Sequence, residues 1–140
     1  MADSVSDKCN INAFDIFEEF NGNCANKEKL SNIFKQYNNV NIQYGDFYNI
    51  LNSFEDNSID ILHIDIANNG DVYEFALKEY IKKMNKNGIM ILEGGSIERD
   101  NIEWMNKYNK RKIKPILDHY SSKFNILTIG TIPSITIISL

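Results

Sequence analysis

Four acidic side chains stand at the ends of four successive apolar segments of this chain: Asp15, Asp46, Asp65 and Glu93. A carboxylate in such a place can accept hydrogen bonds from hydroxyl groups, bind a cation or accept a proton from a reacting group. Four like charges brought together would raise one another's pKa unless cations or hydrogen-bond donors lay between them. If the segments are neighbouring strands, the pattern predicts an acidic cleft that suits a cationic ligand or a metal ion, with Asp65 as the first candidate.

The elements that would position these acids alternate along the chain. Hydrophobic periodicity predicts strands at 11–15, 40–44, 59–64 and 89–92, and two further β-rich runs within 124–140 that are split at 130–134. Helices are predicted around 30–37, 50–54, 71 to about 86, 104–108 and 116–120, and capping-box spacing occurs at Asp71 with Glu74 and at Asp100 with Glu103. The fold class is therefore α/β, with a mainly parallel sheet, helices on both faces and a C-terminal antiparallel hairpin. Parallel pairing would bring the four acids to one edge of the sheet.

Length, composition and charge limit the classes of protein to which this sequence can belong. A chain of 140 residues with 43% apolar residues predicts one globular domain over 1–140. The net charge of −4 gives no basic surface for nucleic acid, and no apolar run is long enough to cross a bilayer. Without a secretory signal we expect a cytoplasmic protein, in which Cys9 and Cys24 are reduced and incidental.

Four stretches of the sequence resemble the Rossmann-like S-adenosylmethionine (SAM)-dependent methyltransferases, in particular small-molecule and sugar O-methyltransferases. The stretches are 13–18, 39–47, 59–65 and 85–94. The resemblance implies that Asp15 holds the ribose hydroxyls of SAM, and that Asp46 holds the adenine amino group with Phe47 beside the ring. It places Asp65 near the methionine part of the cofactor, where the metal-dependent branch of the family binds a divalent cation.

The same resemblance implies the reaction. A methyl group would pass from the sulfonium to an oxygen of a small-molecule acceptor, with Asp65 or Glu93 helping to remove the acceptor proton. The metal-dependent branch carries a pair of acidic or amide groups where this chain has Glu93-Gly94, which argues against a bound metal.

The chain departs from the family at its amino-terminal end. The first strand and its glycine-rich turn should precede Asp15, but none of the fourteen residues before it is glycine, and 1–7 resemble the end of the helix that follows that turn. The resemblance thus implies a truncated domain, incomplete at its N-terminus. An absent central strand would leave an unpaired sheet edge, which favours self-association into a homo-oligomer.

Other interpretations remain open at this point. Asp15 and Asp46 are equally explained as residues that form turns or cap helices, and Asp65 as a turn former before Asn68-Asn69-Gly70. His63 fits a hydrogen-bonded core residue better than a base. As a whole, the chain could be a non-catalytic methyltransferase remnant that serves as an interaction module. A metal-dependent hydrolase has only the acid cluster in its favour.

Overall fold

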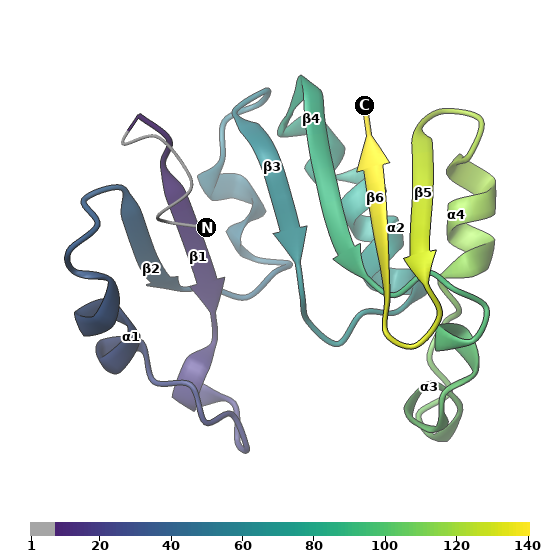
Figure 1. The fold of residues 1–140 in the computed structure, drawn as a ribbon, viewed down its shortest axis with the longest axis horizontal. Helices are drawn as coiled ribbons and strands as arrows, with labels where there is room; N and C mark the ends of the chain where they lie inside the picture. Colours follow the sequence, from purple (N-terminus) through teal and green to yellow (C-terminus); the bar gives the residue numbers. More distant parts are fainter. Residues whose placement is uncertain (1–7) are drawn as a thin grey trace. The chain divides into compact units, whose positions relative to one another are not determined.

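The computed structural model describes residues 8–140 (Figure 1). The chain divides into two compact units, Met1–Asn52 and Ser53–Leu140. Each unit is described by itself. The interpretation of 1–7 as the end of a helix lies outside the described residues, and the single domain over 1–140 stays a prediction. Within residues 8–140 no helix combines the length and the apolar character that crossing a membrane would need.

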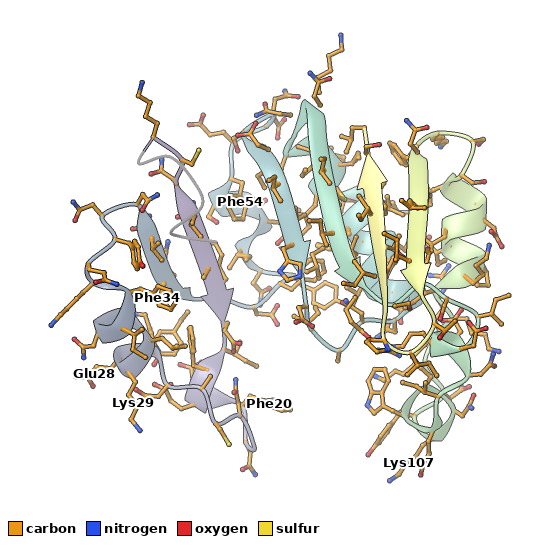
Figure 2. All side chains as sticks on the ribbon, viewed as in Figure 1. Phe20, Glu28, Lys29, Phe34, Phe54 and Lys107 are labelled. Carbon is orange, nitrogen blue, oxygen red and sulfur yellow. The ribbon has the colours of Figure 1, made fainter. Side chains whose placement is uncertain are left out.

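The first unit is built on a parallel pair of strands. β1 (Ile11–Asp15) pairs with β2 (Val40–Tyr44) from Ile11 opposite Val40 to Asp15 opposite Tyr44. Parallel strands need a crossover between them, which here contains the 3-10 turn η2 (Phe17–Glu19) and α1 (Lys27–Phe34). The side chain of Asn26 begins α1 by accepting a hydrogen bond from the Lys29 backbone N–H at 3.0 Å. The exposed side chains of Glu28 and Lys29 project from this helix (Figure 2).

The short turn η3 (Ile50–Ser53) leads into the second unit, which holds a four-stranded sheet in the order β3-β4-β6-β5. β3 and β4 are parallel, whereas β6 is antiparallel to both of its neighbours. The elements are β3 (Ile59–Ile64), α2 (Gly70–Lys78), η4 (Tyr80–Lys82), β4 (Met84–Glu93), η5 (Arg99–Asn101), α3 (Glu103–Lys107), α4 (Lys114–Tyr120), β5 (Asn125–Gly130) and β6 (Ser134–Ser139). The predicted α/β class, with parallel pairs and a C-terminal antiparallel hairpin, is confirmed.

Helices pack against one face of this second sheet, and aliphatic side chains are exposed on the other. α2 and α4 contact each other and lie on the same side of the sheet (Figure 1). Side chains alternate along each strand, so one face buries Met90, Leu92 and Ile138, all 0% exposed. The opposite face carries aliphatic side chains in solvent, namely Ile61, Ile89, Leu127, Ile129 and Ile135. In this unit the expected helical cover is seen on one face.

The boundary between α2 and β4 differs from the prediction. The helix expected to reach about residue 86 ends at Lys78, and the strand begins at Met84 rather than at Ile89. The segment before Ile89 pairs with the start of β3 instead of extending the helix. The backbone N–H groups of Ser58 and Ile59 donate hydrogen bonds to the Lys83 carbonyl at 2.8 and 2.9 Å. A shift in register at the start of the β3–β4 ladder accommodates the extra residues.

Neither predicted capping box forms. The N-cap of α2 is Asn69, whose side chain accepts a hydrogen bond from the Asp71 N–H at 2.8 Å. Asp100 does not cap the helix next to it in sequence. Its carboxylate accepts hydrogen bonds from the N–H groups of Ile113 at 2.7 Å and Lys114 at 2.8 Å, at the start of α4.

Candidate functional site

In the first unit, Asp15 and Asp46 lie at the same edge of the parallel pair. Asp15 is the last residue of β1, its carbonyl accepts a hydrogen bond from the Gly45 N–H at 3.0 Å, and Asp46 comes directly after Gly45. Both carboxylates are exposed. The half-buried Phe47 follows, with its ring in edge contact with Tyr48 at a centroid distance of 5.0 Å. The structure therefore brings together three of the predicted site residues.

These two acids also shape the local turns. Asp15 Oδ1 accepts hydrogen bonds from the Phe17 N–H at 2.6 Å and from Asn23 Nδ2 at 3.1 Å. Asp46 Oδ1 accepts one from the Tyr48 N–H at 3.0 Å. The turn-forming role is thus present, and because both side chains are exposed, their carboxylates can still reach a ligand.

In the second unit, Asp65 and Glu93 come together at the carboxyl ends of neighbouring parallel strands. The last paired residues of the β3–β4 ladder are Ile64 and Leu92, and each acid directly follows one of them. Their surroundings differ. The Asp65 side chain is exposed, whereas both Glu93 carboxylate oxygens accept hydrogen bonds from Arg99, from Nε at 2.9 Å and from Nη2 at 3.1 Å.

Asn68 was not predicted as part of the site, whereas the sequence placed Arg99 at the mouth of the cleft as a residue that could hold an acidic substrate. Asn68 is 0% exposed, and its Nδ2 donates to the backbone carbonyls of Ile64 and Glu93. Its sequence context, Asn68-Asn69-Gly70, indicated only a turn. The Arg99 side chain is 9% exposed and pairs with Glu93 rather than with its neighbours in sequence. The run Glu98-Arg99-Asp100 had indicated local ion pairs and a helix cap instead.

Two aromatic side chains, Tyr73 and Trp104, contact this cluster. Tyr73 is 0% exposed, and its hydroxyl donates to the Glu93 carbonyl at 3.2 Å. Burial is the main reason why the pKa of Tyr73 is raised far above its ordinary value, so this hydroxyl stays protonated. The Trp104 ring centroid lies 5.7 Å from Arg99 Cζ and 5.7 Å from Lys110 Nζ, which places two cations against one ring.

Metal ligation finds little support in the donor set. Within residues 8–140 no group of three or more His, Cys, Asp or Glu side chains is placed so that it could hold a metal ion. His63, expected in the core, is exposed on β3 because helices do not cover that face of the sheet. Cys9 and Cys24 are both free and exposed.

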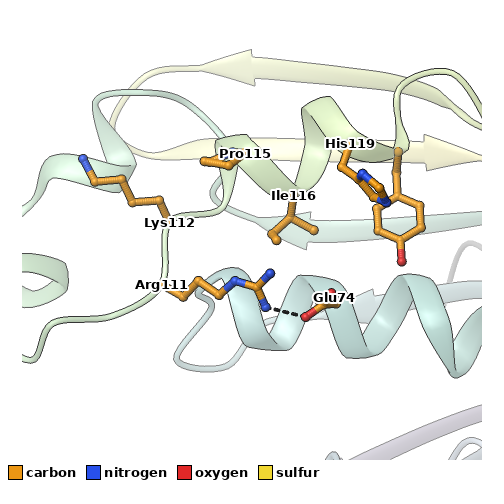
Figure 3. A pocket seen from close by; sticks show the side chains of 7 residues that line it. Glu74, Arg111, Lys112, Pro115, Ile116 and His119 are labelled. Atoms are coloured by element: carbon orange, nitrogen blue, oxygen red, sulfur yellow. Dashed lines mark hydrogen bonds and ion pairs between the residues drawn. The ribbon is translucent and has the colours of Figure 1, made fainter.

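A separate pocket of about 360 Å³ opens beside α4 (Figure 3). It is lined by Glu74, Arg111, Lys112, Pro115, Ile116, His119 and Tyr120, and none of the predicted site residues belongs to it. Hydrogen bonds from Arg111 and Lys78 lower the pKa of Glu74 to about 2. The Glu74 carboxylate is therefore ionised and already paired, which makes it a poor proton acceptor at neutral pH.

Comparison with solved structures decides the fold. A putative O-methyltransferase from Klebsiella pneumoniae superposes with a TM-score of 0.68 at 11% identity, covering 100% of this chain and 66% of that one. The chain has the Rossmann-like methyltransferase fold. An O-methyltransferase from Bacillus cereus, solved in complex with S-adenosylhomocysteine (SAH), has a TM-score of 0.66 at 13% identity and covers 99% of this chain and 66% of that one.

The methyltransferase fold extends to enzymes with other acceptor atoms. The CurJ carbon methyltransferase matches with a TM-score of 0.65 at 13% identity, over 99% of this chain and 43% of that one. The chain thus spans at most about two thirds of the length of these three structures. No protein-family model and no curated protein matches its sequence.

Proposed function

We propose that the chain is a SAM-dependent methyltransferase domain that transfers a methyl group to an oxygen atom of a small-molecule acceptor. The observation that carries the proposal is the fold, which two structures described as O-methyltransferases share over 99–100% of this chain. The second of them was solved with SAH, the product form of the cofactor. A net charge of −4 favours a small molecule over nucleic acid as the acceptor, and we propose that the domain acts in the cytoplasm.

The first unit offers groups that fit the nucleoside part of SAM. Asp15 and Asp46 present exposed carboxylates at the ends of parallel strands, where ligands of open α/β sheets collect. In the proposal, Asp15 accepts hydrogen bonds from the ribose hydroxyls, Asp46 accepts one from the adenine amino group, and Phe47 packs against the ring. When bound, SAM supplies an electrophilic methyl group on its sulfonium sulfur.

The second unit supplies the proposed proton acceptor. Asp65 is exposed at the end of β3 and can accept the proton of an acceptor hydroxyl as well as lie beside the cationic part of the cofactor. The same role for Glu93 stays a prediction. Proton uptake by Glu93 would remove the negative charge that strengthens its two hydrogen bonds from Arg99, so the proposal gives Asp65 the larger part. No step is assigned to a metal ion.

Isothermal titration of the purified chain with SAH tests the proposal directly. We expect the wild-type chain to bind, and Asp65→Asn and Asp46→Asn each to weaken binding by about tenfold, a typical loss for one charge-assisted hydrogen bond. Asp60→Asn is the matched control, because Asp60 is an exposed carboxylate on β3, the strand that Asp65 follows, and is hydrogen-bonded to Asn85.

Each outcome has a definite meaning. Weaker binding by both variants with an unchanged control supports a cofactor site built on the strand ends. Absence of SAH binding by the folded wild-type chain would contradict the proposed function.

A further inference from the structure

Asn68 joins the carboxyl ends of β3 and β4 at the point where their ladder stops. Its Nδ2 donates to the carbonyl of Ile64, the last residue of β3, at 3.0 Å, and to the carbonyl of Glu93, the last residue of β4, at 2.9 Å. One amide therefore satisfies two backbone acceptors at the carboxyl ends of neighbouring strands. Because Asn68 is 0% exposed, water does not compete for these bonds.

Arg99 connects the backbone of Asn68 to the Glu93 side chain. Its Nε and Nη2 bind the two Glu93 carboxylate oxygens, and Nη2 also lies 3.4 Å from the backbone carbonyl of Asn68. The planar guanidinium fixes both distances at once, which a flexible ammonium group cannot do. Asn68, Glu93 and Arg99 thus form a closed ring of hydrogen bonds, and we call these three residues the strand-end clamp.

The clamp is not an arrangement that stability alone would favour. Asn68 Oδ1 and Arg99 Nη1 are buried without a hydrogen-bond partner in the described part of the chain. Buried polar atoms are nearly always paired, so an unpaired acceptor and an unpaired donor in one cluster need an explanation other than stability. The explanation we favour is geometric, because the clamp holds the backbone on both sides of Asp65.

The loop after β3 is short and is held at both ends. The Ile64 carbonyl, immediately before Asp65, is bound by Asn68, whose own N–H donates to the Ile66 carbonyl at 2.6 Å. On the far side, Asn69 caps α2. The backbone of Asp65 is therefore fixed while its side chain remains exposed, which is what a preorganised binding group requires.

We propose that Asn68 and Arg99 are positioning residues that hold Asp65 in place for the cofactor and the acceptor. The inference rests on the proposed function, because it assumes that Asp65 touches these ligands. Neither residue needs to contact them itself. A misplacement of the reacting or binding group by about 1 Å is enough to reduce function by one to two orders of magnitude.

The test uses four single variants of the full chain, one double variant and two readouts. Asn68→Ala removes the amide, Arg99→Lys keeps the charge but loses the planar fork, and Asp65→Asn removes the positioned group. Asn69→Ala is the control, since it weakens the start of α2 from the same loop and leaves the clamp intact. The readouts are the Kd for SAH and the rate of hydrogen exchange in the peptide that covers residues 64–69.

We expect Asn68→Ala and Arg99→Lys to speed exchange in this peptide and to weaken SAH binding by about tenfold. We expect Asp65→Asn to weaken binding with exchange unchanged. In a double variant, Asn68→Ala should have no further effect once Asp65→Asn is present, because it acts through that side chain. Equal losses of SAH binding in Asn68→Ala and Asn69→Ala, or additive losses in the double variant, would show a merely structural role and overturn the proposal.

Arg99→Lys keeps the test open if Asn68→Ala does not fold. If the wild-type chain does not bind SAH, the proposed function fails, and the exchange readout decides about the clamp alone. Faster exchange confined to residues 64–69 then supports the positioning of this loop, and unchanged exchange overturns it.

Discussion

Asp65 and Glu93 show how two carboxylates in equivalent places acquire different chemistry. Each follows the last paired residue of one of two neighbouring parallel strands. The Asp65 side chain is exposed, while the Glu93 carboxylate is held by a guanidinium that is itself 9% exposed. A free carboxylate can accept a proton or approach a cation, and a carboxylate with both oxygens bonded to arginine is better suited to hold its partner.

The Glu74 carboxylate provides a prediction at the same scale. Hydrogen bonds from Arg111 and then Lys78 lower its pKa to about 2 from an ordinary value of 4.5. A lowered pKa in the folded state means that the ion pairs stabilise the protein above about pH 4.5 and that this contribution is lost as the pH falls through about 2. We expect Glu74→Gln to reduce the free energy of unfolding at pH 6 by about 0.5 kcal/mol, the usual size for surface pairs.

Urea unfolding of the wild type and of Glu74→Gln across this pH range checks the assignment. The difference in unfolding free energy should shrink as the pH is lowered from 4.5 toward 2. A difference that stays constant down to pH 2 would mean that the pairs with Arg111 and Lys78 do not form.

At the scale of elements, the second unit is stabilised by caps that come from distant parts of the chain. Asp100 is 2% exposed and accepts hydrogen bonds from the Ile113 and Lys114 N–H groups at the start of α4. We expect Asp100→Ala to lower the free energy of unfolding by about 1–3 kcal/mol, because the Ile113 N–H is left buried without an acceptor. Asp118→Ala, which removes an exposed carboxylate of α4 that pairs with Lys114, should have an effect below about 1 kcal/mol in the same urea titration.

Two adjacent glycines after β4 offer a sharper comparison. Gly94 and Gly95 both have φ near +100°, at 102° and 109°. A Cβ on Gly95 would lie 2.0 Å from Thr136 Oγ1, whereas a Cβ on Gly94 would meet the end of the flexible Ile113 side chain at 2.9 Å. Both alanine variants bear the same backbone strain, about 1 kcal/mol.

We therefore expect Gly95→Ala to lose about 1–3 kcal/mol more than Gly94→Ala, from the steric clash alone. Thermal unfolding of the two variants under one set of conditions measures the difference. Equal unfolding temperatures would contradict the close approach of this loop to β6.

Most strands could be predicted from the sequence, but one boundary between a helix and a strand could not. Periodicity predicted β1, β2, β3 and the C-terminal hairpin because their apolar residues alternate or run together over four to six positions. Periodicity failed between α2 and β4. Tyr80 and Met84 fit one face of a longer helix, but Tyr80 belongs to η4 and Met84 to β4, and both are buried there. The strand-end acids could be found from sequence, and Arg99 could be placed near the cleft. The role of Asn68 and the pairing of Arg99 with Glu93 could not, because tertiary contacts set these partners.

At the scale of the whole molecule, the sheet of the second unit combines a strand edge with an apolar face that is exposed. Within residues 8–140, β3 is hydrogen-bonded only to β4, which leaves its other edge free of strand pairing. Ile61, on this edge strand, is 59% exposed, and the aliphatic side chains of the same face extend across β4, β6 and β5. A strand edge without a hydrogen-bonded neighbouring strand, beside an apolar face, favours pairing with another chain.

We propose that this edge mediates self-association, and light scattering after size exclusion at several concentrations tests it. The wild type should form dimers or larger species as its concentration rises. Ile61→Lys should reduce association, since a charge on an edge strand opposes pairing. Ile97→Lys, at a position that is 62% exposed outside the sheet, is the control and should change nothing. A wild-type monomer at all concentrations would contradict the proposal.

Trp104 gives the molecule a built-in optical reporter. It is the only tryptophan in the chain, and its ring lies 5.7 Å from both Arg99 Cζ and Lys110 Nζ. The emission of an indole responds to nearby charge, so a change in the position of Arg99 should shift its fluorescence without any added label. Because Arg99 also binds Glu93 at the end of β4, light absorbed by one side chain of α3 would report on events at the strand ends.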